Sequence, residues 1–299
     1  MLDDLAAAVT RHGGDGLWSD SAVPRLTLTT LDEPVLPFDV LYEPLICFTV
    51  TGAKRGVAGD RSWTTGRGEM FLNSLVMPVT ATFEELPYRS AVLRLDGRTL
   101  ADLLLELDGA GPRALPDPSK GPCGQISAPM TPEIVDAVTR WVRLLDTPEH
   151  IGALASRIEA EILYRLLVSP LGPILRHLTL ADTAAARVRS AARWICAHYA
   201  EPLTIEAVAS VAHMSTATLY RHFKAATGMS PLRFQKHLRL QEARRRLLAG
   251  NTTAALVAEA VGYVSATQFN REYRRAYGLP PAQDAARLRG ELVNAGRAR

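Results

Sequence analysis

Apolar and polar residues between positions 203 and 281 alternate with the spacing of amphipathic helices, and the same arrangement occurs twice. The first copy contains two apolar stripes, formed by Val208, Ala209 and Ala212 and then by Leu219, Phe223 and Ala226. Residues one, three or four positions apart share one face of a helix, so each stripe predicts a helix with one buried face. A two-residue turn between the stripes would pack the two helices together.

The second copy repeats the first at a fixed distance. The segment from Ser215 to Pro231 recurs 50 positions later, from Ser265 to Pro281, whereas the residues upstream of these serines recur at an offset of 49. We therefore predict two helix-turn-helix units, with one extra residue in the second turn, near Gly262. The serines are expected N-caps, because a hydroxyl can accept hydrogen bonds from the free N–H groups of the first helical turn.

The exposed faces of the two second helices carry small, hydrogen-bonding and basic side chains. These positions are Ser215, Thr216, Ala217, Thr218, Tyr220, Arg221 and Lys224 in the first copy, and Ser265, Ala266, Thr267, Gln268, Asn270, Arg271 and Arg274 in the second. Small residues allow close approach to a DNA major groove, amides and hydroxyls read base edges, and arginine reaches guanine or phosphate. Two helical hairpins with solvated faces are the alternative, but the duplication with matched caps and arginines favours DNA binding.

The region resembles the DNA-binding domain of the AraC/XylS family of bacterial transcription regulators, in which a long helix joins two helix-turn-helix motifs. The matching positions are Leu203-Thr204, Arg221-x-Phe223-Lys224, Gly228-x-Ser230-Pro231, Arg239-Leu240, Val257-Ala258, Gly262-Tyr263, Phe269-x-Arg271-x-Tyr273-Arg274 and Gly278-x-x-Pro281. The chain departs from the family where Pro280 replaces a serine or threonine and Asp284 replaces an aromatic residue. These departures concern the packing of the final helix and not the two reading helices.

This arrangement predicts how the protein would bind DNA. Two reading helices held by one rigid helix over residues 231–248 would enter successive major grooves, about 34 Å apart. We expect Arg221 and Arg271 to make the principal contacts, and Gln268 and Asn270 to read bases. A homodimer would pair two such sites, and RNA polymerase would be a further partner.

Charge is distributed unevenly along the 299 residues. From residue 183 onward there are 18 Lys and Arg against 7 Asp and Glu, a balance of +11, whereas residues 1–182 contain 16 against 24, a balance of −8. A basic C-terminal part and an acidic N-terminal part predict a polyanionic partner, double-stranded DNA, for the C-terminal part alone. The run Arg244-Arg245-Arg246 is interpreted as a solvated helix face or as a phosphate contact.

Residues 20–100 contain short runs rich in β-branched and aromatic residues, separated by proline, glycine and charged turns. The runs cover residues 25–30, 45–50, 69–72, 79–84 and 91–95. Short strands with frequent turns predict a β-barrel or sandwich. Gly52-x-Lys54 and Leu75-x-x-Pro78-Val79 resemble the cupin-like sensor domain of a subgroup of the same regulator family, which implies that this part binds a small-molecule effector of unknown identity or serves dimerisation.

Candidate ligand contacts at a pocket mouth are Lys54, Arg55, Arg61 and Trp63, although a solvated hairpin loop explains them as well. Catalytic cupins usually hold a metal with clustered histidines, and no histidine occurs between His12 and His150. We therefore expect no metal, no cofactor and no enzyme activity. The alternative function is a barrel enzyme that the C-terminal domain tethers to DNA. A fused DNA-repair methyltransferase is disfavoured, because three scattered cysteines cannot form its zinc site.

Two helices are predicted after the strands. Thr131-Pro132-Glu133 opens the first with a capping hydroxyl, proline at the first position and an acid in the first turn, and residues 148–168 form the second. Their apolar faces either form a dimer interface or cover the barrel. Residues 173–183 are the expected interdomain segment, residues 184–199 a helix that docks on the first motif, and residues 285–299 a frayed helix or mobile tail.

Together these patterns predict an α+β chain in three parts. Residues 1–130 form a cupin-like β-barrel or sandwich, residues 131–180 a helical pair and linker, and residues 181–299 an all-α domain with two helix-turn-helix motifs. The expected function is sequence-specific DNA binding and transcription regulation under small-molecule control. An acidic pair stands where a signal peptide needs positive charge, and no apolar run approaches the ~18 residues of a membrane span, so we expect a cytoplasmic protein. Cys47, Cys123 and Cys196 are too few and too scattered to predict a disulfide framework.

Overall fold

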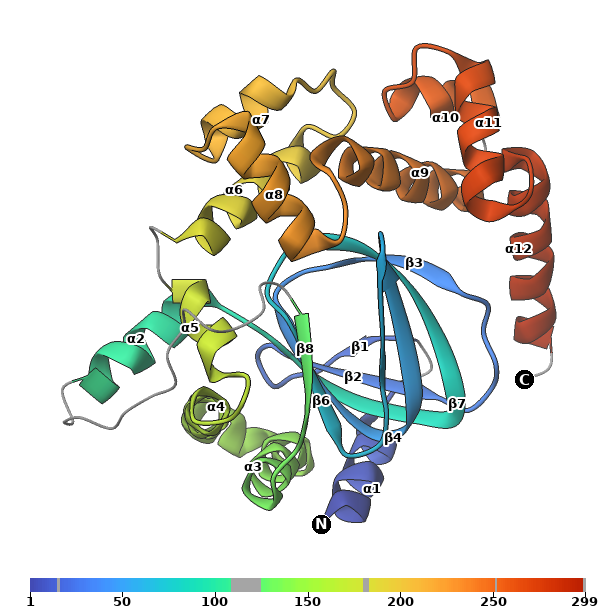
Figure 1. The fold of residues 1–299 in the computed structure, drawn as a ribbon. Helices are drawn as coiled ribbons and strands as arrows, with labels where there is room; N and C mark the ends of the chain where they lie inside the picture. The colour runs from blue at the N-terminus through green and yellow to red at the C-terminus, as the bar shows by residue number, and fades with distance from the viewer. Residues whose placement is uncertain (15–16, 109–124, 180–182, 251, 298–299) are drawn as a thin grey trace. The chain divides into compact units, whose positions relative to one another are not determined.

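The computed structural model describes residues 1–14, 17–108, 125–179, 183–250 and 252–297. The chain forms two compact units, namely residues 1–189 with 221–228, and residues 190–220 with 229–299. One β-sheet with helices packed against it makes up the N-terminal part, and the C-terminal part is helical (Figure 1). The predicted α+β class is confirmed.

Eight antiparallel strands form the sheet within the described residues. They are β1 (Ser19–Asp20), β2 (Leu26–Leu31), β3 (Phe38–Tyr42), β4 (Leu45–Ala58), β5 (Arg61–Thr65), β6 (Glu69–Asn73), β7 (Met77–Arg94) and β8 (Gln125–Pro129). Their hydrogen-bonded order is β1-β2-β7-β4-β6-β8, with β3 added beside β7 and β5 beside β4. Irregular register between Thr49 and Lys54 bends the long strand β4, as β-bulges do.

Residues 79–84 and 91–94 of two expected strands belong to the single strand β7, which ends at Arg94. The charged and proline-containing stretch between them stays in the ladder, since Glu85 pairs with Ala53 and Arg89 with Thr51 of β4. A turn signal in the sequence was therefore overridden by pairing with a partner strand more than 30 residues away.

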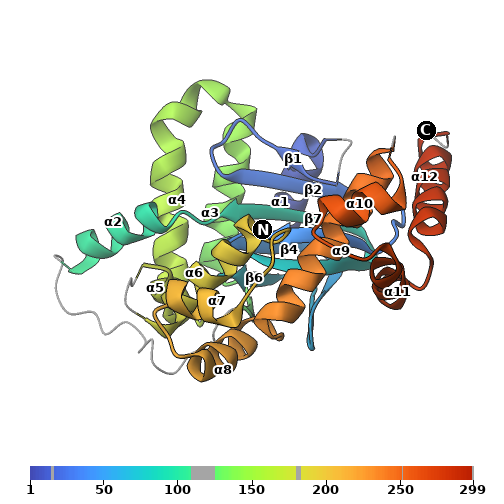
Figure 2. The same cartoon turned by 90° about the horizontal axis from the view of Figure 1, so that it is seen from above.

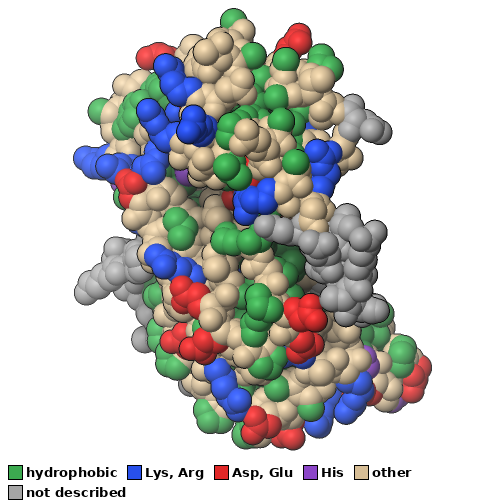
Figure 3. Space-filling view, turned by 90° about the vertical axis from the view of Figure 1, so that its right-hand side faces the viewer, with side chains coloured by type: hydrophobic (Ala, Val, Ile, Leu, Met, Phe, Trp, Pro, Cys, Tyr) green, Lys and Arg blue, Asp and Glu red, His purple; other side chains and the backbone are tan. Residues whose placement is uncertain are grey.

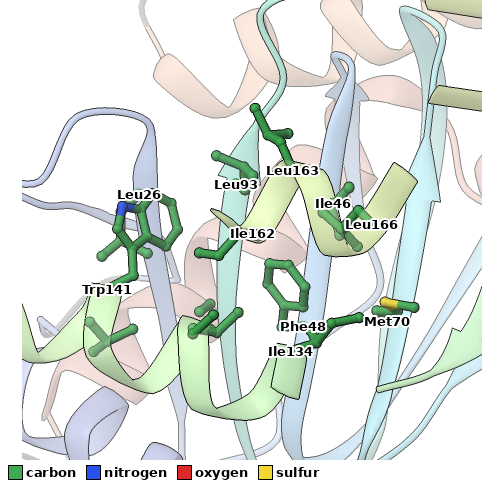
Figure 4. Packing of buried hydrophobic residues seen from close by; sticks show 14 of the residues in the cluster. Leu26, Ile46, Phe48, Met70, Leu93, Ile134, Trp141, Ile162, Leu163 and Leu166 are labelled. Atoms are coloured by element: carbon green, nitrogen blue, oxygen red, sulfur yellow. The ribbon is translucent and has the colours of Figure 1, made fainter. Parts of the chain in front are cut away.

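In the described residues of this part, two short 3-10 helices, Leu144–Asp146 and Pro148–His150, join α3 to α4, and the sheet is accompanied by five α-helices. They are α1 (Leu2–His12), α2 (Gly97–Asp108), α3 (Pro132–Arg143), α4 (Ile151–Leu167) and α5 (Gly172–Thr179). Thr131 caps α3 by accepting a hydrogen bond from Ile134 N, as predicted. The apolar faces of α3 and α4 share one core with the sheet, and Figure 4 shows Trp141 beside Leu26 and Ile162 near Phe48 and Leu93. Of the two roles considered for these helices, the structure shows the one in which they cover the sheet.

Three helices of the N-terminal part, α1, α2 and α5, are absent from the sequence prediction. Helix α5 lies in the stretch expected as an interdomain segment, and its Ile174 and Leu175 are buried in the core of the sheet domain. Proline and glycine at the start of α5 suggested a linker, but burial of the Ile174 and Leu175 side chains favours a helix. Cys47 and Cys196 are free thiols, whereas Cys123 and the rest of residues 109–124 lie outside the described residues.

Seven helices form the described C-terminal part. They are α6 (Ala184–Ala197), α7 (Ile205–Val211), α8 (Thr216–Thr227), α9 (Pro231–Ala249), α10 (Ala254–Ala260), α11 (Ala266–Tyr277) and α12 (Pro281–Arg297). Helices α7 and α8 form the first predicted helix-turn-helix, α10 and α11 the second, and α9 is the linking helix (Figure 2). The tail expected to be frayed or mobile is helical as far as Arg297. None of the helices in the described ranges has the length and apolar character needed to cross a bilayer.

Candidate nucleic-acid interface

The first helix-turn-helix is closed by its apolar stripes and by a tight turn. Val208, Leu219 and Phe223 have no exposed surface. In the turn, Met214 N donates to Ala209 O over 3.0 Å. His213 takes the left-handed conformation, with φ 50°, that allows the chain to reverse there.

The second motif has the same turn with a different residue at the reversal. Tyr263 N donates to Ala258 O over 2.9 Å, which is the counterpart of the bond in the first turn. Gly262 takes the left-handed position with φ 87°, and a Cβ added to it would lie 2.0 Å from Ala200 O. The extra residue is Val264, whose relative exposure of 105% shows that it projects into solvent. The predicted insertion therefore lies in the turn and leaves both helices intact.

Serine caps start both reading helices, α8 and α11. Ser215 Oγ accepts from Thr218 N and Ser265 Oγ accepts from Gln268 N, each over 3.3 Å. Gly278 ends α11 in the left-handed conformation, which a glycine adopts without steric cost. Each reading helix is thus fixed at its start by its own sequence, as predicted.

The side chains expected to contact DNA lie on the open sides of these helices. Exposed positions are Ser215, Thr216, Ala217, Tyr220, Arg221 and Lys224 on the first, and Ser265, Ala266, Thr267, Gln268, Asn270, Arg271 and Arg274 on the second. Thr218 is half-buried and accepts from Ser215 Oγ over 2.9 Å. Lys and Arg side chains gather over the C-terminal helices on the face shown in Figure 3. Contact of these residues with DNA stays a prediction.

Glu272 is a member of this surface that the sequence analysis missed. Its Oε1 lies 3.0 Å from Lys236 Nζ of α9 and accepts from Gln268 Nε2 over 3.3 Å, while Tyr263 Oη donates to its Oε2 over 2.9 Å. Burial raises the pKa of Glu272, but these partners lower it by more, so it lies below its ordinary value and the carboxylate is charged. The four-residue spacing from Gln268 was the available signal.

Asp284 explains how the last helix packs despite its departure from the family pattern. This side chain has no exposed surface, and it accepts from Arg244 Nε over 2.9 Å, Tyr273 Oη over 3.0 Å and Arg287 over 2.8 Å. The guanidinium of Arg244 also lies 4.3 Å from the ring centre of Tyr277.

The arginine run on α9 is largely engaged within the protein. Arg244 is bound by Asp284, and Arg245 and Arg246 both pair with Glu242, over 2.7 and 2.6 Å. Arg244 is neither part of a solvated helix face nor available for a phosphate contact. It is 11% exposed and helps α9 pack on α12.

The four candidate ligand contacts of the N-terminal part do not share one face. Lys54 and Trp63 lie on the same face of the β4–β5 hairpin, because their pairing partners are Thr65 and Gly56. Arg55 points to the other face, where its side chain lies 3.8 Å from Glu84. Arg61 shares the face of Lys54 and Trp63, because it pairs with Ala58, but it lies at the far end of the hairpin. Across the described residues, no group of three His, Cys, Asp or Glu side chains could hold a metal ion.

Comparison with known families agrees with this architecture. The model of the AraC-type transcriptional regulator N-terminus matches residues 22–174, which is half of the chain. The chain belongs to the AraC-type transcriptional regulators. A helix-turn-helix domain model matches residues 208–287 of this regulator, the part that contains both motifs.

Several curated relatives of this AraC-type regulator are transcription regulators by name. It is 29% identical over 73% of its length to a probable thc operon regulatory protein of Rhodococcus erythropolis, of which 73% is covered. It is 38% identical over 29% of its length to the uncharacterized regulator YobQ of Bacillus subtilis, and 27% identical over 50% to the activator RhaS of Escherichia coli. The matches span 36% of YobQ and 53% of RhaS, so the chain covers about half of these two relatives or less.

Solved structures of ToxT from Vibrio cholerae share the fold of this AraC-type regulator. An apo ToxT variant covers 88% of the chain with a TM-score of 0.56 and 11% identity, and 97% of that structure is covered. A ToxT structure with a bound unsaturated fatty acid covers 87% with a TM-score of 0.53 and 10% identity, with 94% of that structure covered. At this identity the likeness concerns the fold alone.

Proposed function

We propose that this protein is a transcription regulator that binds specific DNA sequences through α8 and α11 and is controlled by a small molecule bound to its N-terminal sheet domain. The observation that carries the proposal is the repeated helix-turn-helix, in which each capped second helix exposes arginines beside small and hydrogen-bonding residues. The predicted partner is double-stranded DNA. The protein acts by binding and not by catalysis.

The chemistry of the two exposed helix faces supports this function. Arg221 and Arg271 can each make a bidentate contact with guanine or bind a phosphate, while Asn270 can hydrogen-bond a base edge. The basic balance of the C-terminal part favours a polyanion, and each neutralised phosphate adds a slope of roughly 0.9 to the log-log dependence of affinity on salt. Dimerisation and contact with RNA polymerase stay predictions.

Small-molecule control is supported by the related fold. One ToxT structure with this fold contains an unsaturated fatty acid, so a molecule of that size can be bound by such a protein. Lys54 and Trp63, which share one face of the hairpin, are the retained candidates for contact with the effector of this chain. Arg55 is not retained, because it lies on the other face beside Glu84.

Binding measurements on an arginine variant test the DNA-binding function. DNA enriched by the wild-type protein from a random-sequence library is titrated in gel shifts with Arg271→Ala, which is expected to lose about 1–3 kcal/mol of specific binding. Arg157→Ala is the matched control, because Arg157 is an exposed arginine on α4. Unchanged affinity and sequence preference in Arg271→Ala, or an equal loss in Arg157→Ala, would refute the assignment.

A further inference from the structure

The N-terminal sheet has two buried faces of opposite chemistry. The face toward the helices is apolar and includes Ile46, Phe48 and Leu93 (Figure 4). The other face of the same strands, called here the polar face, carries Thr27, Thr29, Cys47, Thr49 and Ser90, none of which is more than 7% exposed. Burying hydroxyl groups costs free energy unless they are hydrogen-bonded. Val92 and Phe71, which pair with Cys47, are buried on the same face, so hydroxyl and apolar side chains are mixed there.

A lysine lies on the polar face among buried aromatic hydroxyls. Lys54 Nζ is 5.5 Å from the ring centre of Tyr42 and 5.8 Å from that of Tyr88. Tyr88 Oη in turn lies 3.5 Å from Cys47 Sγ. Within the described part of the chain, no carboxylate forms an ion pair with Lys54, in contrast to Arg55, which has Glu84 beside it.

The ammonium group of Lys54 keeps its charge in this setting. Burial lowers the pKa of Lys54, but Tyr42, Tyr88 and Cys47 raise it by more, so the pKa lies above its ordinary value. Burial raises the pKa of Tyr88, which therefore remains a neutral hydroxyl. A half-buried positive charge that forms no ion pair with a carboxylate attracts an anion.

Thr49 provides a second and independent observation. It has no exposed surface, and its Oγ1 has no hydrogen-bond partner within the described residues. Thr49 follows Cys47 by two residues on β4 and pairs with Ser90 of β7, so its side chain belongs to the polar face. Leaving a buried hydroxyl unsatisfied is costly, and an acceptor on a bound molecule would satisfy it.

Aromatic rings border the same face. Phe71 pairs with Cys47 across β4 and β6, and Trp63 stacks on Phe71 with ring centres 5.0 Å apart. Gly56 allows this placement, since a Cβ there would lie 2.3 Å from the Trp63 ring. These rings offer apolar contact area next to the charged and hydroxylated groups.

We propose that the polar face binds a small organic molecule in which one carboxylate is attached to an apolar body. Lys54 is the counter-ion of the carboxylate, the Thr49 hydroxyl donates to an oxygen of the ligand, and Phe71 and Trp63 contact the apolar body. A monocarboxylate matches the charge of Lys54, since the Arg94 side chain at the end of β7 is paired with Asp20 over 2.9 Å. The Arg61 side chain at the far end of the hairpin donates to the backbone oxygens of Ala225 and Ala226. The inference rests on the proposed function, because this molecule would be the effector.

Matched pairs of probes test the carboxylate. Hexanoate with hexanamide, and benzoate with benzamide, are titrated calorimetrically into the full chain at neutral pH. At least one carboxylate is expected to bind tenfold or more tightly than its amide. Equal binding of acid and amide in both pairs, or no binding of any probe, would overturn the proposal. This titration uses only the wild-type protein, so its outcome does not depend on the folding of a variant.

Variants test the residues. Lys54→Met is expected to weaken carboxylate binding at least tenfold, and Thr49→Val about three- to tenfold. Neither variant is expected to change the affinity for the amides. Arg55→Met is the control, since it removes a neighbouring charge from the other face of the same strand. A loss in Arg55→Met as large as in Lys54→Met contradicts the assignment. If the wild type enriches a DNA sequence but discriminates no carboxylate, this inference fails alone; if it enriches no sequence, the proposed function fails.

Discussion

The helices that follow the two helix-turn-helix motifs, α9 and α12, differ at an equivalent position where both bury a side chain. Phe234 follows the first motif and Asp284 stands 50 positions later, and both have no exposed surface. A phenyl ring needs only apolar neighbours, whereas the carboxylate requires Arg244, Tyr273 and Arg287 around it. The comparison teaches that a repeated fold can keep a buried position while exchanging hydrophobic packing for a hydrogen-bonded ion cluster.

The turns of the two motifs also place different residues at an equivalent backbone position. His213 and Gly262 occupy equivalent left-handed positions, with φ 50° and 87°. The second turn approaches Ala200 so closely that no Cβ fits, whereas the first accommodates a histidine. The second motif is therefore the less tolerant of the two at the turn, and the following predictions test the ion cluster and the turn in order of expected effect.

Removing the carboxylate at Asp284 is expected to have the largest effect. Asp284→Ala removes the carboxylate beside the Arg244 guanidinium, which is 11% exposed, and breaking a buried ion pair costs about 3–5 kcal/mol. Amide hydrogen exchange of α9, α11 and α12 in the full chain measures the loss. The double variant Arg244→Met/Asp284→Phe, which restores an apolar pair, is expected to recover part of the stability. Unchanged exchange in Asp284→Ala would contradict the ion-cluster account.

Acid should weaken the second motif through the same residue. Burial raises the pKa of Asp284, but Arg287, Arg244 and Tyr273 lower it by more, so the folded-state pKa lies below its unfolded value. The carboxylate therefore contributes stability above the unfolded pKa of about 3.9, and this contribution is lost as pH falls through the folded pKa. Exchange protection of α12 in the wild type should drop over that range. An identical drop in Asp284→Asn would show that another group is responsible.

The turn glycine should matter less than Asp284 but more than its histidine counterpart. Gly262→Ala forces a Cβ against Ala200 O in a left-handed conformation, and we expect a loss of about 1–3 kcal/mol. His213→Gly removes the side chain from an equivalent position, and the change should stay within about 1 kcal/mol. Thermal unfolding of both variants measures this. A larger loss in His213→Gly than in Gly262→Ala would reverse the comparison.

The smallest expected effect concerns how one side chain reads bases. Glu272 holds the Gln268 amide nitrogen over 3.3 Å, a helical pair worth about 0.2–0.5 kcal/mol. Glu272→Ala frees the amide and should change base preference at one or two positions of a selected site. His222→Ala on the first reading helix, at the equivalent position, is the control. Identical preferences in wild type and Glu272→Ala would show that Glu272 does not orient Gln268.

Local signals were sufficient to predict the framework of the DNA-binding part from the sequence. The apolar stripes and the caps Ser215 and Ser265 each depend on a few neighbouring positions, and the extra turn residue follows from comparing the two copies. The ion cluster was out of reach, because Arg244 and Asp284 are 40 residues apart and meet only after α9 and α12 pack. The same holds for the polar face of the sheet, since Thr49 and Ser90 become neighbours only through strand pairing.

Selection of binding sites from random-sequence DNA tests the central claim most directly. Wild-type protein should enrich two short elements whose centres lie about one helical turn, 10–10.5 base pairs, apart. Arg221→Ala should lose preference in one element and Arg271→Ala in the other, with the remaining element retained. Enrichment of a single element that both variants recognise unchanged, or no enrichment by the wild type, would contradict reading of DNA by both α8 and α11.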